Sequence, residues 1–153
     1  MLVVVSVVLA LSAPWLRGFF ASRQTADAAT TVLSLTQWAR SQAVAQGRPY
    51  RLNVDSSSGT YWLTAQQAGA YVAPDSDMGR HFHLPEGATA QVRPDSTEPA
   101  QPAESAKDYL QFYPSGRNDP GSIEIVGRQG EVYLVSAPSA TEPFRVISPS
   151  EAP

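Results

Sequence analysis

The sequence contains no cysteine, and this absence excludes several chemistries at once. Disulfides, thiolate metal ligands and cysteine nucleophiles all require a side chain that the protein does not have. The compartment stays open, because exported proteins can do without disulfides. The length of 153 residues fits one domain of ordinary size.

Charged side chains are also scarce, but only in the N-terminal part of the sequence. Residues 1–16 carry no charged side chain at all. Residues 1–51 then hold five arginines against Asp27 alone, whereas residues 52–153 hold six basic and thirteen acidic side chains. Binding to the phosphates of a nucleic acid requires a basic surface, so this acidic outer part disfavours a nucleic-acid partner.

The uncharged run allows three interpretations. A full membrane span needs about 20 apolar residues, and this run is shorter. A signal peptide has an apolar region of this length, but it starts with a basic segment, and Pro14 directly after Leu11-Ser12-Ala13 is unfavourable for cleavage. The third interpretation is a span whose first residues precede Met1. The spacing does not decide between the three, although a buried core helix is disfavoured because the run has no polar stripe.

Glycine and proline are nearly absent from residues 17–46, where Gly18 is the single exception. Apolar residues recur there at spacings of three and four, which marks one face of a helix. Gly47 and Pro49 provide the stop. The pattern predicts a helix from residue 2 to residue 46, about 68 Å long at 1.5 Å per residue. We expect Pro14 to bend or loosen it. The predicted buried face comprises Ala29, Val32, Leu35 or Thr36, Ala39 and Ala43, widened by Leu33 and Trp38.

From residue 48 onwards the pattern changes to short strands separated by turn-forming residues. Residues 94–107, rich in Pro, Ala, Ser and Glu, predict an exposed loop. A long helix followed by antiparallel strands indicates an α+β fold. We therefore expect a helical part, 1–47, made of an apolar portion 1–16 and an amphipathic portion 17–47, and a β-rich head, 48–153. The predicted strands are 50–54, 60–64, 88–93, 109–113, 122–126, 131–136 and 144–147.

Two motifs carry a family resemblance. The first is Ala-Arg-Ser-x-Ala-x-x-x-Gly-Arg at residues 39–48, and the second is Phe-x-x-x-Gly-Arg at residues 112–117. Together with the apolar run ending in Ala13-Pro14, they make the sequence resemble the GspH/FimT-type pseudopilins, minor pilin-like subunits of type II secretion and type IV pilus systems. Family members start with a basic leader and a Gly-Phe-Thr-Leu-Ile-Glu processing site. This sequence starts within the apolar segment, which a downstream start or a trimmed sequence would explain.

The resemblance implies a non-enzymatic minor pseudopilin with a pilin-like α+β fold, and it implies neither cofactor nor small-molecule substrate. It implies a single-pass anchor in the bacterial inner membrane, a periplasmic head, other pseudopilins as partners, and secreted proteins as substrates of the machine. Residues implied in membrane or filament packing are Leu2, Val3, Val4, Val5, Val7, Val8, Leu9, Leu11, Pro14 and Leu16. Residues implied as structural parts of the motifs are Ala39, Arg40, Gly47, Arg48, Phe112, Gly116 and Arg117.

Two other functions remain open at this point. One is a minor type IV pilin that serves pilus assembly or DNA uptake, with Arg117 and Arg128 as DNA contacts. DNA-binding relatives carry an arginine-rich motif near the C-terminus, whereas residues 144–153 here hold one arginine, so we interpret both as solvated or paired turn residues. The other is a secreted binding module or hydrolase released from a signal peptide.

Weaker chemical signals are interpreted as structure. His81 and His83 predict two imidazoles on one strand face near Asp75 and Asp77, but no third metal ligand at a suitable spacing is evident. Ser115 lies in a Pro-Ser-Gly turn, and no Gly-x-Ser-x-Gly elbow is present. The stretch 127–130, Gly-Arg-Gln-Gly, predicts a hairpin turn because strands flank it on both sides.

Overall fold

The computed structural model describes the backbone of residues 2–94 and 108–148, with all side chains in these ranges except those of residues 2, 9 and 11–15. One long helix, α1 (Leu2–Gln46), comes first, and short strands follow it. They are β1 (Tyr50–Asp55), β2 (Thr60–Gln67), β3 (Ala70–Val72), β4 (Phe82–His83), β5 (Thr89–Pro94), β6 (Tyr109–Phe112), β7 (Gly121–Val126), β8 (Val132–Ser136) and β9 (Arg145–Ile147), with a 3-10 turn, η1 (Asp77–Gly79).

The helix has the predicted bounds and is continuous through Pro14. A proline removes one hydrogen bond from the helix, while the turns on either side keep theirs, so the expected loosening does not divide α1. The helix ends where Gly47 adopts a φ of 63°, a left-handed conformation that glycine reaches without strain.

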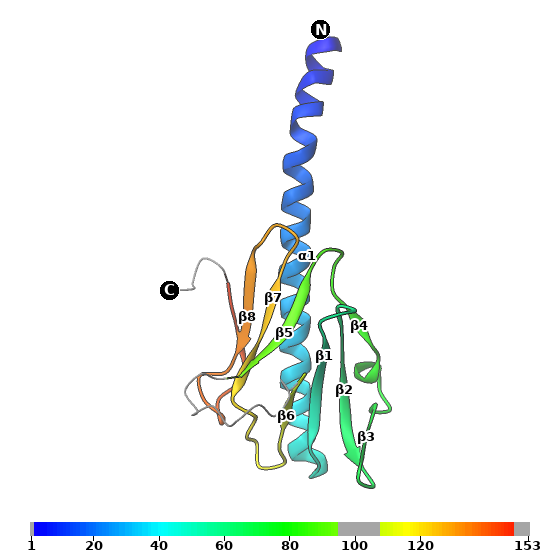
Figure 1. Cartoon of the computed structure of the whole chain (residues 1–153), viewed down its shortest axis with the longest axis vertical. Helices are drawn as coiled ribbons and strands as arrows, with labels where there is room; N and C mark the ends of the chain where they lie inside the picture. The colour runs from blue at the N-terminus through cyan, green and yellow to red at the C-terminus, as the bar shows by residue number, and fades with distance from the viewer. Residues whose placement is uncertain (1, 95–107, 149–153) are drawn as a thin grey trace.

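The strands form two antiparallel sheets that pack on the same half of the helix (Figure 1). Sheet A has the order β3-β2-β1-β6, with β4 paired to the other end of β2. Sheet B has the order β5-β7-β8-β9. Strands of both sheets contact α1, and its N-terminal half projects beyond the head (Figure 1).

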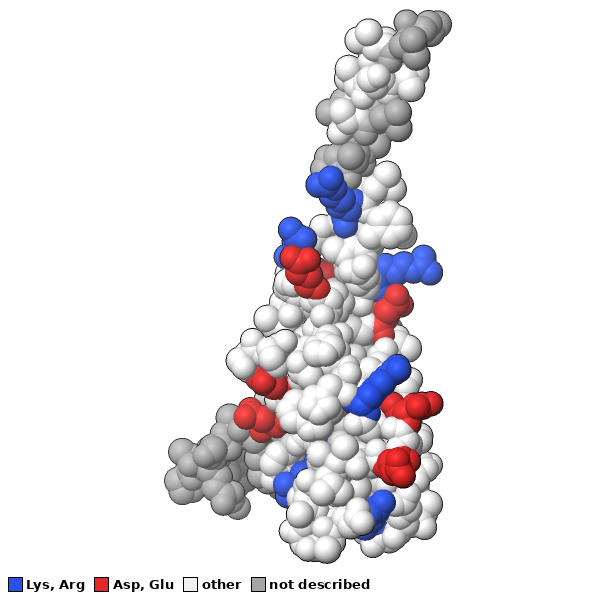
Figure 2. All heavy atoms as spheres, turned by 90° about the vertical axis from the view of Figure 1, so that its right-hand side faces the viewer, with Lys and Arg blue, Asp and Glu red and all other residues white. Residues whose placement is uncertain are grey.

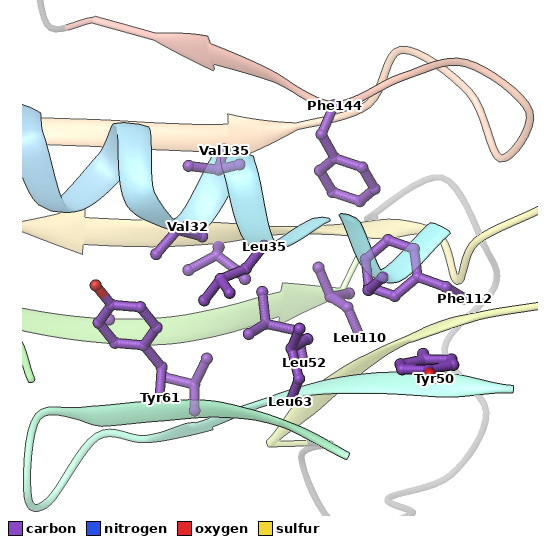
Figure 3. Close-up of a cluster of buried hydrophobic side chains, with 14 of the residues drawn as sticks. Val32, Leu35, Tyr50, Leu52, Tyr61, Leu63, Leu110, Phe112, Val135 and Phe144 are labelled. Atoms are coloured by element: carbon purple, nitrogen blue, oxygen red, sulfur yellow. The ribbon is translucent and has the colours of Figure 1, made fainter. Parts of the chain in front are cut away.

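The core lies between the helix and the two sheets (Figure 3). Leu63, Leu52 and Leu110 are in register across β2, β1 and β6, and all three are buried. Val135 of β8 and Phe144 close the core from the side of sheet B (Figure 3). The buried face of α1 confirms the predicted periodicity and comprises Thr25, Ala28, Ala29, Val32, Leu35, Thr36, Ala39 and Ala43.

Seven strands form at the predicted places, within one to three residues at each end. The short elements β3, η1 and β4 were not predicted. Pro94, expected to start a loop, instead ends β5 opposite Gly121, a place where its missing N–H is tolerated. The rest of the predicted loop, 95–107, lies outside the described residues.

Candidate assembly surfaces

The N-terminal half of α1 exposes apolar side chains on every side that the structure describes. Val3 is 75% exposed and Val7 51% exposed, and they have no head to pack against. Figure 2 shows no charged side chain among the described residues at the free end of the rod, before its first basic side chain. The other exposed apolar side chains implied in packing are Val4, Val5, Val8 and Leu16.

Four further residues implied in packing fall where the side chains are not described, namely Leu2, Leu9, Leu11 and Pro14. Their backbone belongs to α1. Among the described residues, no helix offers an apolar stretch of the length that crossing a membrane requires.

The sequence-based list missed two exposed aromatic residues, Phe19 and Phe20. They follow Gly18 on the last free turns of the helix, and their rings meet edge to face with centroids 6.2 Å apart. The signal is visible as a Phe-Phe pair inside a predicted helix, but the pair follows Arg17, the first charged residue, and so lies beyond the predicted apolar portion.

The β7–β8 turn fixes the point where the free half of the helix begins. The turn is the predicted hairpin, since Gly127 N–H donates to Glu131 O at 2.8 Å. The Glu131 carboxylate accepts a hydrogen bond from the buried Thr25 hydroxyl at 2.9 Å, 106 residues away in sequence. A Cβ at Gly127 would lie 2.0 Å from Glu131 Oε1 and 2.6 Å from Thr25 Oγ1, so a side chain there would displace the carboxylate from this bond.

The first motif lies at the C-terminal end of α1 and joins the helix to both sheets. Ala39 is fully buried, and Arg40 donates from Nη2 to the carbonyl of Thr141 in the β8–β9 connection. After Gly47 turns the chain, the Arg48 guanidinium lies 5.7 Å from the ring centroid of Tyr50, the first residue of β1.

The second motif forms the turn after β6 and lies beside the first. Phe112 is fully buried and contacts the ring of Phe144 at a centroid distance of 5.8 Å. Gly116 has a φ of 82°, and a Cβ there would lie 3.9 Å from Val44 of α1. Arg117 is exposed, while its carbonyl accepts a bond from Tyr113 N–H at 2.8 Å. The fold thus brings together two motifs that lie more than sixty residues apart.

The two histidines are placed in separate contacts. His81 stacks on Trp62 with centroids 4.8 Å apart, and His83 Nδ1 lies 3.3 Å from Thr60 Oγ1. Thr60 and Trp62 are two residues apart on β2 and share a face of that strand, so both imidazoles lie on one face, as expected, although β4 begins at Phe82 and His81 lies just outside it. Asp75 and Asp77 are exposed, and across residues 2–94 and 108–148 no group of three candidate ligands is arranged to hold a metal ion.

The arginines and the serine considered for other chemistries lie on exposed turns. Ser115 is exposed in the turn between Tyr113 and Gly116. Arg128 is exposed in the β7–β8 turn, where its side-chain carbons lie 3.0–3.2 Å from the position of a Cβ on Gly87. Arg117 and Arg128 therefore belong to the ends of two different turns.

A long helix, half free and half covered by two antiparallel sheets, defines a pilin-like protein. The minor pseudopilin EpsH from the type 2 secretion system of Vibrio cholerae has this fold, with a TM-score of 0.68 and 16% identity over 86% of this chain and 98% of that one. A second EpsH structure gives 0.65 and 17%, covering 84% and 99%. The type IV minor pilin FimU of Pseudomonas aeruginosa gives 0.59 and 22%, covering 88% and 96%.

The family model of the type II transport protein GspH matches residues 28–140. The chain therefore belongs to the GspH family. It is a minor pseudopilin of a type II secretion system, a structural protein and not an enzyme, and its family places it in the cell envelope. A comparison with curated protein sequences gives no match.

Proposed function

We propose that the exposed half of α1 anchors this pseudopilin in the bacterial inner membrane and later packs among the helices of other pseudopilins. The head would then lie in the periplasm and contribute surfaces to a filament that helps folded proteins leave the cell. The observation that carries the proposal is the exposure of the large apolar side chains that the structure describes on this half of the helix, which are Val3, Val4, Val5, Val7, Val8, Leu16, Phe19 and Phe20. Soluble proteins rarely expose so many large apolar side chains together unless lipid or another protein covers them.

The helix geometry supports both states. Membrane helices and filament cores satisfy backbone hydrogen bonds within the helix, so a rod can leave lipid and enter a bundle without breaking any. The described part of the rod carries apolar residues on all faces rather than on one stripe, as both surroundings require. Leu2, Leu9, Leu11 and Pro14 join this surface in the proposal.

The absence of cysteine makes a direct test simple. A single cysteine is introduced by Val7→Cys or by Val44→Cys, the latter as a matched control. The two valines are 51% and 53% exposed, but Val44 lies on the half of α1 that the head covers. In cells that produce the whole secretion system, the cysteine is labelled with a maleimide that carries a benzophenone, which on illumination inserts into C–H bonds of any neighbouring chain. This photocrosslinker should join position 7, and not position 44, to other pseudopilins. The chain should pellet with inner membranes.

Two results would contradict the proposal. One is equal crosslinking from both positions, which would show that the apolar half has no special partner. The other is a product found free in the medium with its N-terminus near residue 14, which would support a secreted module released from a signal peptide instead.

A further inference from the structure

The face of sheet A that points away from α1 carries an arginine held by aromatic rings. The Arg51 guanidinium carbon lies 3.5 Å from the ring centroid of Tyr71 and 4.1 Å from that of Tyr109. Its Nε donates to Gln111 Oε1 at 2.9 Å, and the Tyr71 hydroxyl donates to the same oxygen at 3.3 Å. We call these four residues, Arg51, Tyr71, Tyr109 and Gln111, the Arg51 clamp. They come from β1, β3 and β6, so the sheet itself assembles the clamp.

The clamp leaves one part of the guanidinium available. Stacking occupies its planar surface and Gln111 occupies Nε, which leaves the terminal Nη nitrogens at the free edge. That edge is the part that binds a carboxylate through two parallel hydrogen bonds. Within the parts of the chain that the structure describes, no carboxylate lies within salt-bridge distance of Arg51.

Sheet B provides a comparison within the same molecule. Arg93, on β5, is paired with Glu124 of β7 at 2.8 Å, and Gln91 donates to the same carboxylate oxygen at 2.9 Å. The hydrogen bond from Arg93 is the main reason that the pKa of Glu124 is lowered. Arg93, on the outer face of sheet B, is therefore paired with a carboxylate of its own chain. Arg51, on the outer face of sheet A, is held in position without such a partner among the described residues.

The surroundings favour a single carboxylate over a polyanion. Arg51 is the only Lys or Arg within β1, β2, β3 and β6. Figure 2, which views the molecule from the side of β3 and β4, shows on that side isolated basic side chains interspersed with acidic ones and no continuous basic surface. A nucleic acid needs several basic contacts along its backbone. Tyr, Trp and Arg are also the residues enriched at the energetic centres of protein interfaces, and Trp62 lies on the neighbouring strand.

We propose that the Arg51 clamp is a docking site for an acidic side chain on the head of another pseudopilin of the same filament. This inference rests on the proposed function, because it assumes that heads meet in an assembly. The incoming Asp or Glu carboxylate accepts hydrogen bonds from the two Nη atoms of Arg51, and the tyrosine rings exclude water from the pair.

The test measures the affinity of the full-length chain, in detergent micelles, for each other full-length pseudopilin of the same system. Arg51→Gln should weaken binding to at least one of them by about 30-fold or more, as expected for the loss of a desolvated charge pair at an interface. Arg51→Lys should restore only part of the affinity, because lysine keeps the charge and loses the planar fork. Arg93→Gln is the matched control and should leave every affinity within about twofold of the wild type.

Several outcomes would overturn the inference. One is an unchanged affinity for every subunit. Another is an Arg51→Lys variant that binds as tightly as the wild type, together with a lowered melting temperature of Arg51→Gln, because the side chain would then act on the stability of the sheet and not through its planar fork. A loss of duplex DNA binding, or of self-association in sedimentation, without any effect on other pseudopilins would assign a different partner. The crosslinks from position 7 keep the two proposals separate: if they form while Arg51→Gln has no effect, only the docking site fails.

Discussion

One continuous helix, α1, has two halves with different surroundings. The lower half is the C-terminal part that the head covers, and the upper half is the N-terminal part that projects beyond it. In the lower half, Val32 is 1% exposed and packs against two sheets. In the upper half, the side chains of valines such as Val3 and Val7 are exposed. The lower half is amphipathic because the head supplies one partner on one side, and the upper half is apolar all round because its partners, by our proposal, surround it.

This difference separates stability from assembly. The lower half holds the fold together, since the free energy of its buried side chains is gained within a single chain. The upper half contributes little to the stability of the isolated chain, because its apolar surface is not buried by the head. Substitutions in one half should therefore change unfolding, and substitutions in the other should change association.

The largest effect is expected from Leu35→Ala, which removes a fully buried side chain from the core. Such a change should lower the free energy of unfolding by about 2–5 kcal/mol, because it leaves a cavity between the helix and the sheets. Val5→Ala in the exposed half should change it by less than about 0.5 kcal/mol. Urea titration of the full-length chain in detergent, followed by tryptophan fluorescence, measures both. Similar losses for the two variants would break the comparison.

A smaller effect is expected at the boundary between the halves. Thr25→Val removes the hydroxyl that donates to Glu131, and it should cost about 1.5 kcal/mol because the bond is to a charged group and Thr25 is buried. Thr30→Val is the control, since the Thr30 hydroxyl is exposed and bonds only its own helix at Ala26 O. The same titration should give nearly wild-type unfolding for the control. A harmless Thr25→Val would mean that the β7–β8 turn does not hold the helix.

Two glycines, Gly18 within α1 and Gly47 directly after it, sharpen the comparison because the same substitution should change stability in opposite directions. Gly47→Ala should destabilise by about 1 kcal/mol, because φ is 63° although no atom lies within 4 Å of the new Cβ. Gly18→Ala should stabilise by up to about 1 kcal/mol, since it sits inside a helix and meets only the flexible end of Gln129. Thermal unfolding followed by circular dichroism would show the two shifts. Equal signs would contradict the roles given to these positions.

The smallest effect concerns pH and the β1–β2 turn. The side-chain hydroxyls of Ser57 and Ser58 and the Ser57 N–H bind the Asp55 carboxylate and lower its pKa from 3.8 to about 2. A carboxyl with a lowered pKa stabilises the folded state above its unfolded pKa, and this contribution is lost as the pH falls from about 4 to 2. Asp55→Asn should therefore flatten the decline of the melting temperature in this window. Parallel curves for the two proteins would show that the turn does not respond to pH.

The long elements could be predicted because their signals are local and repeated. The buried face of α1 follows from the spacing of Ala29, Val32 and Ala43, and its end follows from Gly47. Strand β3 could not be found in this way, because its tight turn uses Ala68 with a φ of 51° where Asn or Asp would have been the usual signal. Strand β4 has two residues and exists because it pairs with β2.

The contacts within the candidate functional surfaces could not be predicted from the sequence. The sequence shows Arg51, Tyr71 and Tyr109 as three separate strand residues, and only the sheet order brings them together. The bond between Thr25 and Glu131 likewise depends on where the β7–β8 hairpin meets the helix. The apolar half of the helix could be predicted, because a long run without charged residues indicates an apolar surface whatever fold follows it.

The bond between Thr25 and Glu131 also marks the point from which the free part of the helix extends. From there to residue 2 the rod extends by about 35 Å at 1.5 Å per residue. A tilt of about 10° at the head would move the tip by about 6 Å, which is close to one helical turn. A small rotation of the head therefore becomes a displacement of about one helical turn at the N-terminal end of α1, which is enough to change its register against a neighbouring helix.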